Sequence, residues 1–372
     1  MGCAGNNETR EENSLENYIL AEFDITEEDT ETETFLFQPV YKESKEDEDG
    51  NQEVIRETPK RECEVEVNGE VITNYEYKFP KAGIYKVKFI FKSPLVDATA
   101  LFWQSENIKT VDLTHFQGQK LTNISLMFNY CTKLESADLS NLDLRNVTDM
   151  SDFVSTCPSL KSINLTNVKT KNLENISALF GNCASLKNID LSCFNTDNVK
   201  NMSSLFYGCE NLETISFPQN FSTKNVTNMN SMFYSCKALE NLNLSNFDTT
   251  KVTDMENMFN DCESLKKIDF KSLKKIDLSN FNTQNVEKME YMFNDCLSLK
   301  ELDLSSFKTP NVKTMGIMFG GCEELTKVNL SNFNVSKADI HGMFYGVKKL
   351  KKEGLITKEK KIIEHYKNDL KG

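Results

Sequence analysis

The 372-residue chain lacks the features that define several large classes of protein. No stretch approaches the roughly 18 consecutive apolar residues of a membrane-spanning helix. Only three histidines occur, none of them tied to a nucleophile or a pair of acids, and glycine-rich phosphate loops are absent. We therefore expect a protein without membrane spans, without enzymatic activity, and with no cofactor and no small-molecule substrate.

A basic surface is also missing. The chain has 43 basic and 56 acidic residues, for a net charge of −13, and the acidic excess is concentrated in residues 1–60. Proteins that bind nucleic acid neutralise its phosphates with lysine and arginine, so nucleic acid is not an expected partner. The N-terminus has no hydrophobic run typical of a secretory signal, which predicts an intracellular chain.

What the sequence does contain is a repeat. The stretch Asn285–Leu304 holds apolar residues in a fixed frame, and this frame recurs from about Leu101 to Leu350. One cysteine occurs in most units, usually 26 residues after the last: Cys131, Cys157, Cys183, Cys209, Cys236, Cys262, Cys296 and Cys322. A fixed period between roughly 20 and 50 residues is typical of a solenoid, in which each unit packs on its neighbours.

Each repeat unit predicts a strand and a short helix. Leu299, Leu302 and Leu304 spell L-x-x-L-x-L, the strand signature of a leucine-rich repeat. Val286 and Met289 begin an i, i+3, i+6/i+7, i+10 spacing that fits one face of a helix. The predicted fold class is an α/β repeat solenoid, similar to leucine-rich repeats, with one parallel strand and one short helix per coil of about 26 residues.

The region before the repeats predicts a small antiparallel β domain. Tyr18–Ile25 is rich in β-forming residues, and Asn68-Gly69 supplies the turn of a clear hairpin. An acidic loop is predicted at Glu43–Gly50. The domain either caps the solenoid or is a separate ligand-binding module. The predicted divisions are a disordered N-terminus at 1–14, this β-rich region at 15–96, repeats at 97–350 and a basic C-terminal cap at 351–372.

The repeats resemble one known family closely. Leu239–Cys262 reads LENLNLSNFDTTKVTDMENMFNDC. It is similar, nearly residue for residue, to the unit of the BspA-like leucine-rich repeat family, and the chain looks like a protist member. The resemblance covers about 250 residues and brings no catalytic residues with it. Many bacterial members are surface proteins or adhesins that bind host or matrix proteins, which implies an interaction role.

The column of repeat cysteines has three possible interpretations: a metal site, a set of disulfides, or a set of buried free thiols. A tetrahedral metal site needs converging ligands, usually in CxxC pairs, and one cysteine per coil does not supply them, so no metal is expected. Disulfides between stacked cysteines are the second reading, but they do not suit a reducing compartment. We interpret the column as a structural ladder of buried free thiols.

The outward side chains of the predicted strands are the candidate partner-binding face. They are short and polar at a regular pitch: Asp112, Asp138, Asn164, Asp190, Asn243, Asp277, Asp303 and Asn329. Leucine-rich repeats commonly bind proteins on this surface. Simple solvation of the strands is the alternative, because alternation of Asp with Asn also relieves repulsion between neighbouring carboxylates.

The N-terminal Met1-Gly2-Cys3 is the last functional signal. Gly2 suits N-myristoylation and Cys3 suits palmitoylation, although Asn6 stands where the motif has serine or threonine. An accidental match is the alternative. We hypothesise a non-enzymatic scaffold held at the cytoplasmic face of a membrane, which recruits a protein partner of unknown identity. The alternatives are a cell-surface adhesin and a structural spacer, in the cytoplasm or at the surface.

Overall fold

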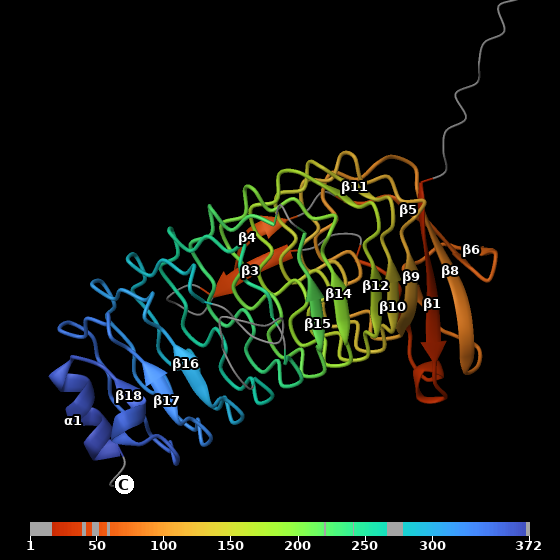
Figure 1. The fold of residues 1–372 in the computed structure, drawn as a ribbon. Coiled ribbons are helices and arrows are strands. Elements are labelled where there is room, and N and C mark those ends of the chain that lie inside the picture. The colour runs from red at the N-terminus through yellow and green to blue at the C-terminus, as the bar shows by residue number, and fades with distance from the viewer. Residues whose placement is uncertain are drawn as a thin grey trace, which may run out of the picture.

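The computed structural model describes residues 17–38, 42–46, 52–57, 60–218, 221–240, 242–265 and 278–369. Figure 1 shows a long solenoid with the N-terminal strands β1, β5, β6 and β8 at one end and helix α1 at the other. Nine bridges join equivalent positions of ten successive coils, from Asp97 to Asp339. Across these described ranges the architecture is a β-solenoid with little helix.

The strands fall into three groups. The N-terminal group is β1 (Tyr18–Ile25), β2 (Thr34–Phe35), β3 (Lys42–Glu46), β4 (Gln52–Glu57), β5 (Cys63–Val67), β6 (Glu70–Ile72), β7 (Glu76–Tyr77) and β8 (Gly83–Phe91). The coils contribute β9 (Ile108–Asp112), β10 (Ser136–Asp138), β11 (Asp143–Leu144), β12 (Ser162–Asn164), β13 (Lys169–Thr170), β14 (Asn188–Asp190), β15 (Thr214–Ser216), β16 (Glu301–Asp303) and β17 (Lys327–Asn329). The C-terminal elements are β18 (Leu355–Ile356) and α1 (Lys360–Asp369), and two 3-10 turns lie at Glu28–Thr30 and Lys352–Gly354.

The predicted short helix of each coil is instead a run of turns. Leu126 and Tyr130 have φ angles of 60° and 62°, and two positive φ angles four residues apart recur in the following coils, as at Asp152 and Thr156. A right-handed helix does not admit such angles. In the described part of the chain the one α-helix is α1, so the α/β expectation is corrected to a solenoid of strands and turns.

The turns differ from a helix because they share their hydrogen bonds with the next coil. Alternate N–H groups donate to it at 2.8–3.0 Å: Ile124 to Asp149, Leu126 to Ser151, Phe128 to Phe153 and Tyr130 to Ser155. The intervening N–H groups of Met127, Asn129 and Cys131 donate three residues back within their own coil. A helix would satisfy all these groups internally and leave nothing to join the coils.

The core runs along the solenoid axis as columns of equivalent apolar side chains. Six consecutive ring pairs stack from Phe180 to Phe344, with centroids 5.5–6.0 Å apart. The parallel strands are in register, so Val111, Ala137 and Ile163 are aligned across β9, β10 and β12. Each coil buries its apolar frame only against equivalent residues of its neighbours, as expected for a repeat protein.

The N-terminal strands extend the sheet of the solenoid. Strand β1 pairs antiparallel with both β8 and β9, which gives a seven-stranded sheet of order β12-β10-β9-β1-β8-β5-β6. The hydrogen-bonding edge of the first coil is therefore covered by β1. Strands β3 and β4 form a separate hairpin, so the loop expected from Glu43 is corrected to a strand as far as Glu46.

Arg61 takes the place of a missing coil at this end. In each later coil, four carbonyls accept N–H groups from the coil before, but the first coil has no predecessor. The buried Arg61 side chain donates to the Asp97 and Thr99 carbonyls at 3.2 and 2.5 Å, and the Gln38 N–H donates to the Leu101 carbonyl at 2.8 Å. Three of the four orphan acceptors are thereby satisfied.

The other end is closed by the C-terminal segment. Strand β18 pairs in parallel with β17, and α1 buries Ile362 and Tyr366. The last coil has N–H groups with no following coil, and the carboxylate of Asp369 accepts the one from Phe344 at 3.0 Å. A charged side chain thus pairs with backbone groups of the terminal coil at each end.

We predict that Arg61→Met lowers the free energy of unfolding by roughly 3 kcal/mol, because buried carbonyls lose a charged donor. Urea denaturation followed by circular dichroism measures the change. Arg145→Met is the matched control, since Arg145 is 60% exposed and pairs with Asp143, and it should destabilise the protein far less than Arg61→Met. Equal stability of the Arg61→Met and wild-type proteins would contradict the capping role.

Candidate functional site

A groove of about 790 Å³ crosses the outward face of the sheet where the N-terminal strands meet the first coils. Its lining comes from β1, β8, β9, β10 and β12: Leu20, Ala21, Glu22, Lys86, Thr110, Val111, Asp112, Ser136, Ala137, Asp138, Ser162, Ile163 and Asn164. Three residues of the predicted partner face, Asp112, Asp138 and Asn164, lie in this sheet groove. The floor is flat because its side chains are short.

The short polar side chains of the floor are held by turns at the ends of their strands. One side-chain oxygen of Asp112, Asp138 and Asn164 accepts the N–H two residues on, at 2.8, 2.8 and 3.1 Å. Asp and Asn form this bond more strongly than Ser or Thr, which accounts for their place in the repeat. These side chains are therefore held in fixed orientations at the ends of their strands.

Neighbouring floor residues also bond to each other across strands. The amide nitrogen of Asn164 donates to both oxygens of Asp138, at 3.1 and 3.2 Å. Partial burial would raise the pKa of Asp138, but the hydrogen bonds from Ser140 and Asn164 outweigh it and hold the pKa below its ordinary value. Asp138 is thus a stable, ionised acceptor in the groove.

The rest of the predicted partner face has the same turn geometry outside the groove. Asp190, Asn243, Asp303 and Asn329 each accept the N–H two residues on, at 2.8–3.2 Å. The structure therefore does not bring all the predicted residues into one site. Asp277 lies outside the described residues.

Sequence reasoning missed the residues that close one end of the groove. Leu20 and Glu22 come from β1, and Lys86 comes from β8. Leu20 is 36% exposed and is the apolar contact of this end. Alternation along β1 indicates that these two side chains share a face, but the pairing of β1 with β9 has no local sequence signal.

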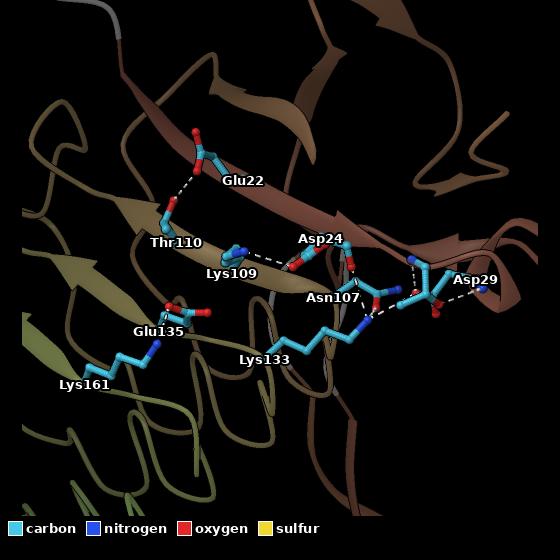
Figure 2. A network of polar contacts seen from close by, with 10 residues as sticks. Glu22, Asp24, Asp29, Asn107, Lys109, Thr110, Lys133, Glu135 and Lys161 are labelled. Carbon is cyan, nitrogen blue, oxygen red and sulfur yellow. Dashed lines mark hydrogen bonds and ion pairs between the residues drawn. The ribbon is translucent and has the colours of Figure 1, made fainter. Parts of the chain in front are cut away.

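A polar network joins the N-terminal strands to the coils beside the groove (Figure 2). Lys109 pairs with Asp24 at 3.0 Å, and Lys133 pairs with Asp29 at 3.1 Å while donating to Asn107 at 2.7 Å. Burial would raise the pKa of Asp29, but hydrogen bonds from Thr26 and the contact with Lys133 lower it to about 2. This network fixes β1 and the turn after it on the first two coils.

The cysteine column lies inside the solenoid, away from the groove. All eight residues of the predicted structural ladder are free thiols and fully buried. Each thiol donates to the backbone carbonyl of an apolar residue in the preceding coil, as from Cys157 to Phe128 at 3.1 Å. Burial raises the pKa of Cys157 and Cys209 to about 12. These thiols are therefore neutral hydrogen-bond donors that help to join the coils.

Lipidation, metal binding and membrane spans are the remaining features that the sequence raised. The lipidation residues Gly2 and Cys3 lie outside the described residues. Among the residues that the structure describes, no group of three His, Cys, Asp or Glu side chains could hold a metal ion. The same part of the chain contains no helix long and apolar enough to cross a membrane.

Comparisons with known proteins identify the repeats. Residues 96–216, 187–274 and 268–358 match the family described as "Mycoplasma protein of unknown function, DUF285". No curated protein matches the chain. Among solved structures it is similar to "Crystal structure of TLR13-ssRNA13 complex", with 13% identity over 64% of this chain and a TM-score of 0.24. This chain spans 42% of the length of that one.

We predict that Asp29→Asn lowers the free energy of unfolding at pH 7 by about 1 kcal/mol, because the folded pKa of about 2 lies below the ordinary unfolded value while solvent screens the partly exposed carboxylate. This contribution is present above about pH 4 and is lost as pH falls towards 2. The difference between variant and wild type in urea unfolding should therefore shrink over that range. Glu28→Gln, at the exposed neighbouring acid, is the control, and a pH-independent difference would contradict the assignment.

Proposed function

The chain belongs to this DUF285 family, and we propose that it is a non-enzymatic repeat protein that binds a protein partner in the sheet groove. The observation that carries the proposal is the groove itself, a rigid polar floor with an apolar contact at one end. Specific protein contacts combine an apolar anchor with satisfied polar groups around it. Leu20 supplies the apolar anchor, and Asp112 and Asp138 supply the polar groups.

The chemistry of the groove supports binding in preference to catalysis. Asp112 and Asp138 each use one oxygen in a turn, and Glu22 accepts the hydroxyl of Thr110 at 3.4 Å. The hydrogen bonds to Asp138 also hold its pKa below the ordinary value, so it is not poised as a general acid. Histidine and cysteine are absent from the groove's described lining. We therefore propose that the protein uses no cofactor, transforms no small-molecule substrate and does not bind nucleic acid.

We further propose that the repeats are of the BspA-like leucine-rich type. The unit Leu239–Cys262 supports this assignment, because its residues match the unit of that family almost throughout. Surface adhesins are common among its bacterial members, so an adhesin that binds host or matrix protein through the same groove is the second candidate function.

The anchor proposal concerns Gly2 and Cys3. A myristoyl chain on Gly2 gives only marginal membrane binding, and a palmitoyl chain on Cys3 would make the attachment stable. The scaffold would then act at the cytoplasmic face of a membrane. This part of the proposal stands apart from the groove, and each can fail without the other.

We predict that the double variant Asp112→Asn and Asp138→Asn loses its protein partner while staying folded, because asparagine preserves the turn and removes the charge. Proximity labelling in the native cell, compared by quantitative proteomics, measures the loss. Asp303→Asn is the matched control, since it makes the same turn bond, at 2.9 Å, outside the groove. Unchanged labelling in the double variant would remove the groove from consideration and favour a spacer.

We predict that the full chain incorporates labelled myristate and sediments with membranes, and that Gly2→Ala abolishes both. Cys3→Ser should retain the myristate and lose most of the stable membrane fraction, because one acyl chain binds only marginally. Absence of label together with protease accessibility on intact cells would contradict the anchor and favour the adhesin.

A further inference from the structure

A second hollow lies on the turn face of the solenoid, on the segments that carry the positive φ angles. It has a volume of about 300 Å³ and crosses four coils, and we call it the tyrosine slot. Its lining residues are Asn129, Tyr130, Asp152, Ser155, Thr156, Ala178, Gly181, Asn182, Ser204 and Tyr207. None of them lines the sheet groove.

The slot exists because one column of side chains changes size along the solenoid. Asn129, Ser155, Gly181 and Tyr207 occupy equivalent positions, since each carbonyl accepts the corresponding N–H of the preceding coil. The side chains in this column become smaller from Asn129 to Ser155 and are absent at Gly181. The next coil then has the large ring of Tyr207 at the same position. The result is a hollow with a floor of small residues and an aromatic wall.

The aromatic wall is held in place from behind. The ring of Tyr207 stacks on Tyr234 with centroids 4.6 Å apart and planes within 10° of parallel. Gly181, the equivalent residue of the preceding coil, has no side chain and also lines the slot. At the far end of the slot Tyr130 is 47% exposed. Two tyrosines therefore line the slot, and the half-buried Tyr207 is held by its stacking on Tyr234.

A buried polar atom in the slot has no partner. Asn129 is 4% exposed, and its Oδ1 is one of two buried side-chain oxygen or nitrogen atoms of the described residues that make no hydrogen bond. Buried acceptors are almost always paired in folded proteins, so an orphan one requires an explanation. A hydrogen-bond donor brought by a ligand would satisfy it.

The remaining lining consists of hydroxyl and amide groups and one carboxylate. Thr156, Asn182 and Ser204 supply neutral donors and acceptors, and no lysine or arginine lies among the described lining residues. Burial raises the pKa of Asp152, so this carboxylate is poorly hydrated and accepts hydroxyl groups readily. The slot suits an uncharged ligand rich in hydroxyl groups and offers nothing to a phosphate.

We propose that the tyrosine slot binds a neutral, linear oligosaccharide. A pyranose ring has an apolar C–H face that packs on an aromatic ring and hydroxyl groups around its edge, which match Tyr207 and the polar lining. An adjoining hollow of about 370 Å³ shares Asn182 and Tyr207 with the slot and continues it along the axis. Coils about 4.8 Å apart follow a repeat close to that of an extended sugar chain. This site is independent of the sheet groove and its protein partner.

The test titrates the full chain with maltohexaose, cellohexaose and chitohexaose by isothermal titration calorimetry. We expect at least one to bind, and Tyr207→Ala to weaken its Kd about tenfold or more, because the stacking wall is lost. Tyr345→Ala is the matched control: Tyr345 occupies the equivalent position in the last coil, outside the slot, and its variant should bind within about twofold of wild type.

A second variant separates binding from folding. Asn129→Leu keeps the branching and the number of side-chain heavy atoms and removes an acceptor that has no partner in the protein, so the urea midpoint should not fall while affinity falls. The groove variant Asp112→Asn and Asp138→Asn should bind the sugar normally. The proposal is overturned if none of the three hexasaccharides binds, if Tyr207→Ala binds as well as Tyr345→Ala, or if binding is lost in the groove variant.

Discussion

The structure depends on a division of backbone hydrogen bonds within each run of turns. Alternate N–H groups, such as those of Leu126 and Phe128, donate to the next coil, and the ones between them donate within their own coil. The first set joins the coils and the second keeps each coil closed. The thiol of each repeat cysteine adds one more bond between coils, as from Cys157 to the carbonyl of Phe128. A coil is therefore complete only when it has a neighbour on both sides.

That constraint makes the two ends special. A solenoid of this kind always leaves acceptors at its first coil and donors at its last. Here the acceptors meet the guanidinium of Arg61 and the backbone of Gln38, and one donor meets the carboxylate of Asp369. Arginine suits the first end because its donors lie in one plane and reach two carbonyls at once. The N-terminal strands are thus joined to the solenoid by the same bonds that join coil to coil.

The repeat, its period and its buried cysteines can be read from the sequence, but the local conformation cannot. Residues such as Met127, Phe128 and Cys131 have the spacing of a helical face, and a run of turns with i to i−3 bonds buries the same positions. Hydrophobic periodicity does not distinguish the two. The candidate sites are less predictable still. Asp112 and Asp138 belong to the repeat, whereas Leu20 enters the groove through a strand pairing with no sequence signal.

A specific binding site can form only where the repeat is interrupted. Because equivalent backbone atoms are stacked in register, a column of identical side chains presents a uniform surface, as Asp and Asn do along most of the strand face. A hollow requires that neighbouring coils differ at one position. The slot arises where Gly181 precedes Tyr207, and the groove arises where β1 replaces a coil beside β9. Both candidate sites therefore follow from the ladder, since the ladder holds the unequal side chains at fixed spacing.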